Sequence, residues 1–331
     1  FVFAGVLAKL LGIVPTLAYN LILPMLYSFT GLGVFSLAYN LVVYRQRSRD
    51  DNIPLRGKDA AAPVFGEQNA AENMSSMGLW AGLTGTVLAI MVGNLAEVGV
   101  LFNAWFSAGS ASLGNLPFIG TIARTADGAI KILGGEPAPI YPGDWFWNAT
   151  RALNYLEGEA APITEFPFFT FLYGDLHAHM ISLPLQLLAL GWTIALVLQN
   201  PGSGIQDSES RPISWWESAL QWLIGGLAIG VLRATNTWDW PTFLVIGALA
   251  VVFYVYRRRG SFDLGTVGQS AVLIALLAGI SIITFWPFAA NYGVGYTSFS
   301  LWPGSYSHLT NYLIIYGLFL FFVITFLLIE F

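Results

Sequence analysis

The stretch that decides the fold is MISLPLQLLALGWTIALVLQ, residues 180–199, which carries no charged side chain. A helix needs about 20 apolar residues to cross the hydrocarbon core of a bilayer, and this run has that length. Other apolar runs lie at about 1–14, 16–44, 77–102, 215–234, 240–256, 266–288 and 311–331. Because a backbone in lipid must satisfy its own hydrogen bonds, we expect every run to be helical. The sequence therefore predicts an all-α, polytopic transmembrane helical bundle with about eight spans, organised as a single transmembrane domain over residues 1–331.

The composition excludes several classes of protein. Hydrophobic residues make up 56% of the chain and charged residues 10%, and the mean hydropathy is +0.64, which is too apolar for a soluble surface. The absence of cysteine excludes disulfides, thiolate metal ligands and a cysteine nucleophile. There is no phosphate-binding glycine motif and no basic patch, so we expect no nucleic-acid partner. The chain starts at Phe1 inside an apolar run, so we expect it to be a fragment of a longer chain.

Basic residues predict the orientation of the chain. The stretch YRQRSRDDNIPLRGKD (44–59) follows the second apolar run, and YRRRG (256–260) follows the sixth. The positive-inside rule places both in the cytoplasm of a multi-pass protein, for which we expect a plasma-membrane location. Residues 45–76 then form a cytoplasmic loop. Residues 103–179, rich in Gly, Pro and Trp, form an external loop in which we expect short interfacial helices.

Ionisable and aromatic polar side chains collect on the predicted external face. Polar groups beside a membrane are costly, so such a collection is typical of a functional site. The set comprises Asp144, Arg151, Glu165, Asp175, His177, His179, Asp239, Tyr292, Tyr296 and His308.

The most informative motif is DLHAH, residues 175–179. In an extended segment Asp175, His177 and His179 would all point to one side, as ligands of a divalent ion such as Zn²⁺ would. An Asp–His pair could instead carry out acid–base chemistry. On a helix, Asp175 and His179 would share a face and His177 would point away. The structural alternative is that Asp175 caps the helix that follows while the histidines form hydrogen bonds at the interface.

Two more carboxylates and two arginines are candidate site residues, and each also has a possible structural role. Glu165 and Asp239 lie just before prolines, and each is a catalytic candidate; the alternatives are a surface carboxylate for Glu165 and a helix cap for Asp239. Arg151 and Arg233 could bind a phosphate or extend to the lipid headgroups. The candidate substrate-binding residues are Arg151, Arg233, Trp238 and His308.

Four stretches resemble a known family: EFPFFTFLYGDLHAHMISLP, WFWNATR, RATNTWDWPTFL and LAKLLGIVPTLAYNLILPMLYSFTGLGVF. They resemble the Chlor-Arch-YYY family of uncharacterised multi-pass membrane proteins of Chloroflexi and archaea. The family's external DLHPH pattern is matched here by Asp175, His177 and His179, with Ala178 in place of Pro.

The layout of that family is similar to that of the C-type (GT-C) membrane glycosyltransferases. The resemblance implies a transferase that uses a polyprenyl-phosphate-linked sugar at the extracytoplasmic face, with membrane lipid as its surroundings. It implies an acid–base role for Asp175 or Asp239, metal ligation or phosphate contacts for the histidines, and a phosphate contact for Arg151 or Arg233. In the GT-C enzymes the leading catalytic acid lies in the first external loop, which would precede Phe1.

Two other functions stay open at this point. The chain could be a non-catalytic structural subunit of a larger membrane complex, including a photosynthetic one, in which His177 or His308 would ligate a chlorophyll magnesium. Pigment-binding histidines usually lie within a helix, whereas these lie at the ends of predicted spans. A transporter would need broken helices that meet at the midplane of the bilayer, whereas the Gly and Pro interruptions here cluster at span ends.

Overall fold

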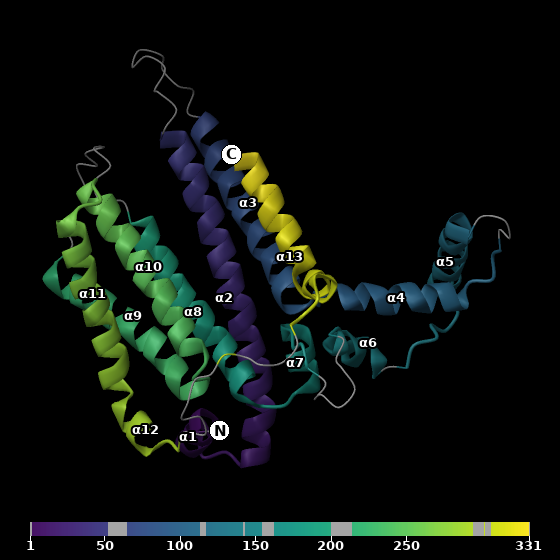
Figure 1. The fold of residues 1–331 in the computed structure, drawn as a ribbon, viewed down its shortest axis with the longest axis horizontal. Helices are drawn as coiled ribbons and strands as arrows, with labels where there is room; N and C mark the ends of the chain where they lie inside the picture. Colours follow the sequence, from purple (N-terminus) through teal and green to yellow (C-terminus); the bar gives the residue numbers. More distant parts are fainter. Residues whose placement is uncertain are drawn as a thin grey trace. The chain divides into compact units, whose positions relative to one another are not determined.

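A computed structural model describes residues 2–51, 65–112, 117–141, 143–153, 162–199, 214–293, 301 and 306–330. Within these residues every regular element is a helix, which confirms the all-α prediction (Figure 1). The chain divides into two compact units. The first comprises Phe1–Thr86 and Asp175–Ser298, and the second comprises Val87–Gly174 and Phe299–Phe331.

Six of the described helices are long and apolar enough to cross a membrane, which confirms a multi-pass membrane protein. They are α2 (Pro15–Asp51), α8 (Ala178–Leu198), α9 (Trp215–Thr235), α10 (Asp239–Arg259), α11 (Leu264–Thr284) and α13 (Leu309–Glu330). A bent pair of helices would raise this number to seven. Within the described residues, the prediction of about eight spans is therefore too high.

Two predicted spans account for the difference. The run 1–14 forms α1 (Val2–Leu11), whose 10 residues extend about 15 Å, against a hydrocarbon core of about 30 Å. The run 77–102 is broken into α3 (Phe65–Ile90) and α4 (Leu95–Ala108), with a bend of 75°. The run was predicted as one span because its mean hydropathy is high, although Gly93 and Asn94 mark the break in the sequence.

Asn94 explains why α4 starts where it does. Its side-chain oxygen accepts a hydrogen bond from the backbone N–H of Ala96 at 3.0 Å, which caps the new helix. Its Nδ2 donates to the carbonyl of Ala149 at 2.7 Å. One buried amide therefore both begins α4 and holds the 3₁₀ helix η1 (Asn148–Arg151) of the second unit against it.

The core of the first unit forms around α8, which packs on α2, α9 and α10 (Figure 1). Trp192, Ile229 and Val251 are among its buried side chains. Helix α9 approaches α8 closely because it carries glycine at the contact: a Cβ built on Gly225 would lie 2.1 Å from the Trp192 ring. Small residues at such contacts are the usual means of tight helix packing in membranes.

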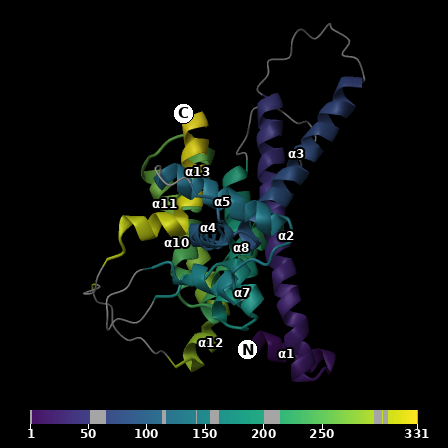
Figure 2. The same cartoon turned by 90° about the vertical axis from the view of Figure 1, so that its right-hand side faces the viewer.

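Helices α2 and α3 pack in the same way within the first unit, where α3 converges on α2 at an angle (Figure 2). Gly78 and Gly82 form a GxxxG pattern on α3. A Cβ built on Gly82 would lie 2.6 Å from the Phe35 ring, so no larger residue fits without a shift of α2.

The second unit is built on a hairpin of α4 and α5 (Pro117–Leu133). A Cβ built on Gly128 would lie 1.7 Å from the carbonyl oxygen of Trp105, so glycine is required at this crossing. The turn is held by Arg124, whose Nε donates to the carbonyl of Gly109 at 2.9 Å. The other elements of this unit are α6 (Asp144–Trp147), the 3₁₀ helix η1 (Asn148–Arg151), α7 (Pro167–Tyr173) and α13.

Both predicted loops contain helical residues. Helix α2 continues to Asp51 and α3 begins at Phe65, so both enter the predicted cytoplasmic loop 45–76, of which residues 52–64 lie outside the described part. The predicted external loop 103–179 contains α5, α6, η1 and α7.

Candidate functional site

The DLHAH segment combines two backbone conformations. Asp175, Leu176 and His177 precede α8 in non-helical backbone, and Ala178 and His179 belong to its first turn. The N-cap position is taken by His177, at φ −122° and ψ 177°, so Asp175 does not cap α8. The motif is therefore neither wholly extended nor wholly helical, and the two histidines come from different local structures.

Asp175 orients the His177 ring through its backbone. The Nδ1 atom of His177 lies 2.6 Å from the carbonyl oxygen of Asp175 and 3.8 Å from its carboxylate Oδ2. A carbonyl oxygen can only accept, so Nδ1 carries the proton and the lone pair of the neutral ring lies on Nε2. This arrangement is the usual one for an imidazole whose other nitrogen acts as a base or a metal ligand.

The two imidazoles have a separation that suits one ion. The ring centroids of His177 and His179 are 5.5 Å apart. Two imidazoles on one tetrahedral Zn²⁺, at about 2.0 Å per bond, place their centroids about 5 Å apart. Asp175 lies on the Nδ1 side of His177, where a carboxylate supports a metal-bound ring rather than joining the metal. His177 and His179 are thus the better-placed ligands of the three.

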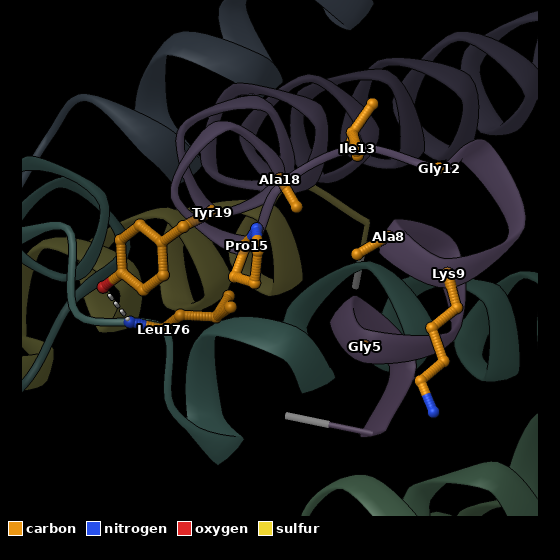
Figure 3. A pocket seen from close by; sticks show the side chains of 9 residues that line it. All are labelled: Gly5, Ala8, Lys9, Gly12, Ile13, Pro15, Ala18, Tyr19 and Leu176. Carbon is orange, nitrogen blue, oxygen red and sulfur yellow. Dashed lines mark hydrogen bonds between the residues drawn. The ribbon is translucent and has the colours of Figure 1, made fainter.

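Beside this segment lies a pocket of about 530 Å³ within the first unit (Figure 3). Its described lining residues are Gly5, Ala8, Lys9, Gly12, Ile13, Pro15, Ala18, Tyr19 and Leu176. Of these nine residues, Lys9 is the only one with a charged side chain, and the other walls are mostly apolar. Lys9 is exposed, so the charge lies at the edge of an apolar cavity, which suits a ligand that has a hydrocarbon part and an anionic part.

Tyr19 fixes the DLHAH segment to the wall of this pocket. Its hydroxyl oxygen accepts a hydrogen bond from the backbone N–H of Leu176 at 3.1 Å (Figure 3). Leu176 is 2% exposed and lines the pocket, and its chain neighbours are Asp175 and His177. The acid–base groups of the motif therefore flank a residue of the pocket wall.

Asp239 lies in a separate polar network that joins three helices of the first unit. Its Oδ2 accepts hydrogen bonds from the Ser182 hydroxyl, from Gln186 Nε2 at 2.7 Å and from Asn236 Nδ2 at 2.9 Å. Trp238 takes the N-cap position of α10, so Asp239 is not its cap. Three donors on one oxygen make this carboxylate an organiser of helix ends rather than an available base.

The α8 residues that contact Asp239 lie on the same face of the helix as His179 of the DLHAH motif. His179, Ser182 and Gln186 are spaced i, i+3 and i+7, so they follow one face of the helix. Successive turns of a helix are about 5.4 Å apart, so the Ser182 contact to Asp239 lies one turn beyond His179. The fold thus brings Asp239 to the helix face that carries His179.

The remaining candidates of the first unit are Arg233, Trp238, Tyr292 and Tyr296. The guanidinium of Arg233 lies 5.3 Å from the centre of the Trp240 ring, so it stacks on that ring at the end of α9. Trp238 is 61% exposed. Tyr292 stacks on Phe288, with 4.9 Å between ring centroids, and Tyr296 lies outside the described residues.

The other sequence candidates belong to the second unit. Glu165 is exposed and accepts a hydrogen bond from the Thr170 hydroxyl at 3.3 Å. Arg151 donates to the Thr150 hydroxyl at 2.6 Å and stacks on Trp147 at 4.2 Å from the ring centre. The remaining candidates are His308, which is exposed, and Asp144, which is half-buried.

Sequence reasoning missed Lys9, Tyr19, Ser182, Gln186 and Asn236. Ser182 and Gln186 offered a usable signal, because polar groups inside an apolar run need a partner. Tyr19 offered none, since its partner Leu176 is 157 positions away in the chain.

Comparison with known proteins identifies a family but no activity. A family model described as "Uncharacterized membrane protein (DUF2298)" matches residues 1–331. Neither a curated protein nor a solved structure matches the chain.

Proposed function

We propose that this chain, which belongs to the membrane-protein family described as DUF2298, is an integral membrane transferase of the glycosyltransferase type. It transfers a sugar from a lipid-phosphate-linked donor at the extracytoplasmic face of the membrane. The observation that supports this proposal best is the apolar pocket with Lys9, whose wall residue Leu176 lies between Asp175 and His177.

In this proposal the pocket and Lys9 bind the lipid-phosphate-linked donor. A polyprenyl phosphate has an apolar chain, which the walls formed by α1 and the start of α2 would accept. The ammonium of Lys9 would attract its phosphate. Among the described residues, no carboxylate lies within ion-pair distance of Lys9 to compete for that charge.

The motif accounts for the proton transfer. In the reaction an acceptor hydroxyl loses its proton, its oxygen bonds to the sugar carbon, and the bond from that carbon to the phosphate oxygen breaks. Asp175, whose side chain is 59% exposed, or the exposed His179 takes the proton. The imidazole nitrogens of His177 and His179 could hold a divalent ion, which when bound would supply positive charge for the leaving phosphate.

The structural observations change the proposed role of Asp239. Because its Oδ2 already receives three hydrogen bonds, we assign it to positioning of α8 and not to proton transfer. Arg233 is also assigned a structural contact, with Trp240.

The test is a transfer assay in proteoliposomes with a panel of polyprenyl-phosphate-linked hexoses. We expect Asp175→Asn and His179→Ala to lower transfer at least 100-fold while both variants insert and remain monodisperse. The exposed residue Asp263, which caps α11, provides the control variant Asp263→Asn. Full transfer by both motif variants would refute the assignment, and a wild-type protein that transfers no hexose would favour a structural subunit.

A further inference from the structure

A second pocket lies within the second unit, on one face of α4. It has a volume of about 370 Å³, near the lower end of the range of about 300–1,000 Å³ for small-molecule sites. Its described lining residues are Ala96, Gly99, Val100, Asn103, Ala104, Ser107, Pro139, Ile140, Asp144 and Asn148. No function discussed so far uses it.

The α4 side of this pocket is lined by short side chains and by one glycine. Ala96, Gly99, Asn103 and Ser107 follow one helix face at intervals of three and four. A Cβ built on Gly99 meets no atom within 4 Å, so space lies directly above the helix backbone. A partly apolar wall of short side chains suits the C–H face of a ring.

The pocket's polar groups have unused hydrogen-bonding capacity. Among the described residues, the side chains of Asp144, Asn148, Asn103 and Ser107 have no hydrogen-bond or ion-pair partner. By contrast, Asn94 of the same unit uses both its side-chain oxygen and its nitrogen. Asp144 is half-buried, and a carboxylate in that position needs donors.

The donor and acceptor types of these side chains indicate which class of ligand the pocket would bind. A carboxylate only accepts, whereas amides and a hydroxyl both donate and accept, so together they match a ligand with several hydroxyl groups. None of the described lining residues is a cation, which disfavours an anionic ligand.

The two sides of the pocket are also held in place before any ligand binds. Asn94 caps α4 and its Nδ2 donates to the carbonyl of Ala149, directly after Asn148. The short helices α6 and η1, which carry Asp144 and Asn148, are therefore tied to the helix that carries Gly99. Such preorganisation lowers the entropic cost of binding.

We propose that the α4 pocket binds a neutral saccharide through Asp144, Asn148 and Asn103 against the α4 side at Gly99. The same saccharide class takes part in the transfer reaction proposed above, but this binding does not depend on that function.

The test measures binding directly by calorimetry of the purified chain in nanodiscs, because maltoside detergents would compete for the site. The probes are maltose, cellobiose and lactose. We expect at least one disaccharide to bind, Gly99→Leu to abolish binding because its side chain fills the pocket, and Asp144→Asn to weaken it at least tenfold. Gly268→Leu is the matched control, since a Cβ there also meets no atom within 4 Å, and should bind as the wild type does.

Two results would overturn the proposal: no binding of any of the three disaccharides, or equal binding by the wild type and Gly99→Leu. Binding that responds to Gly99→Leu, together with an absence of sugar transfer, would leave the saccharide pocket in place and refute only the transferase function.

Discussion

Gln186 of α8 donates a hydrogen bond to Asp239 of α10 at 2.7 Å, across 53 positions of the sequence. Ser182 of α8 and Asn236, the C-cap of α9, donate to the same carboxylate oxygen. Three helices that cross the membrane are thus joined at one buried polar point, one helical turn from His179.

Removal of the Asp239 carboxylate should destabilise the first unit. In Asp239→Ala, Ser182 (0% exposed) and Asn236 (7% exposed) would lose their acceptor inside the protein. Buried donors left without partners cost about 1–3 kcal/mol each, so we expect a loss of about 2–4 kcal/mol. Thermal unfolding in nanodiscs measures this, with Glu136→Gln, a change of an exposed carboxylate, as the control. An unchanged unfolding midpoint would contradict the network's structural role.

Tyr19→Phe should loosen the DLHAH segment without harm to the rest of the fold. The change leaves the N–H of Leu176 without its acceptor, at a cost of about 1 kcal/mol. We expect faster hydrogen exchange at the Leu176 amide and a lower kcat for transfer with little change in KM for the donor. The control is Tyr256→Phe, whose ring contacts Phe262. Equal exchange at Leu176 in both variants would show that the bond does not hold the segment.

Gly5→Leu should block the pocket beside the motif. A Cβ at Gly5 meets no atom within 4 Å, and this residue lines the pocket, so a larger side chain enters the cavity rather than the packing around it. We expect binding of polyprenyl phosphate in vesicles to weaken at least tenfold, about 1.4 kcal/mol. Gly279→Leu on α11, which is equally open, should have no effect. Undiminished binding by Gly5→Leu would exclude this cavity as the lipid site.

Acid should loosen the α4–α5 hairpin of the second unit. Hydrogen bonds from the backbone N–H of Ser110 and from Lys131 lower the pKa of Asp127 below its ordinary value. A carboxylate with a depressed pKa in the folded state stabilises the fold above its ordinary pKa of about 3.9, and the effect is lost as the pH falls through the folded-state pKa. At neutral pH we expect the amides of Ser110 and Ala111 to exchange more slowly in the wild type than in Asp127→Asn. In strong acid the exchange rates of the two proteins should become equal. A constant ratio across this pH range would refute the assignment.

The apolar runs alone determined that this is an all-α membrane protein, because the need to cross a bilayer is met by each segment on its own. The sequence also predicted DLHAH as a candidate site, because ionisable residues at the end of a span are energetically costly. The number of spans was less accessible. Helix α1 is too short to span, and the break before Asn94 depends on a side-chain cap and on the contact with Ala149. The polar residues at that break are few, so the hydropathy averaged over the whole run stays high.

Only the tertiary structure decided which polar groups form hydrogen bonds within the protein. Asp175 and Asp239 looked equivalent as carboxylates near span ends, yet one is 59% exposed and the other receives three hydrogen bonds. Their difference comes from partners on other helices, as does the contact between Tyr19 and Leu176, 157 positions apart. A hydrogen bond is made where two groups meet in space, and that meeting is set by how the helices pack rather than by the residues next to either group in the chain.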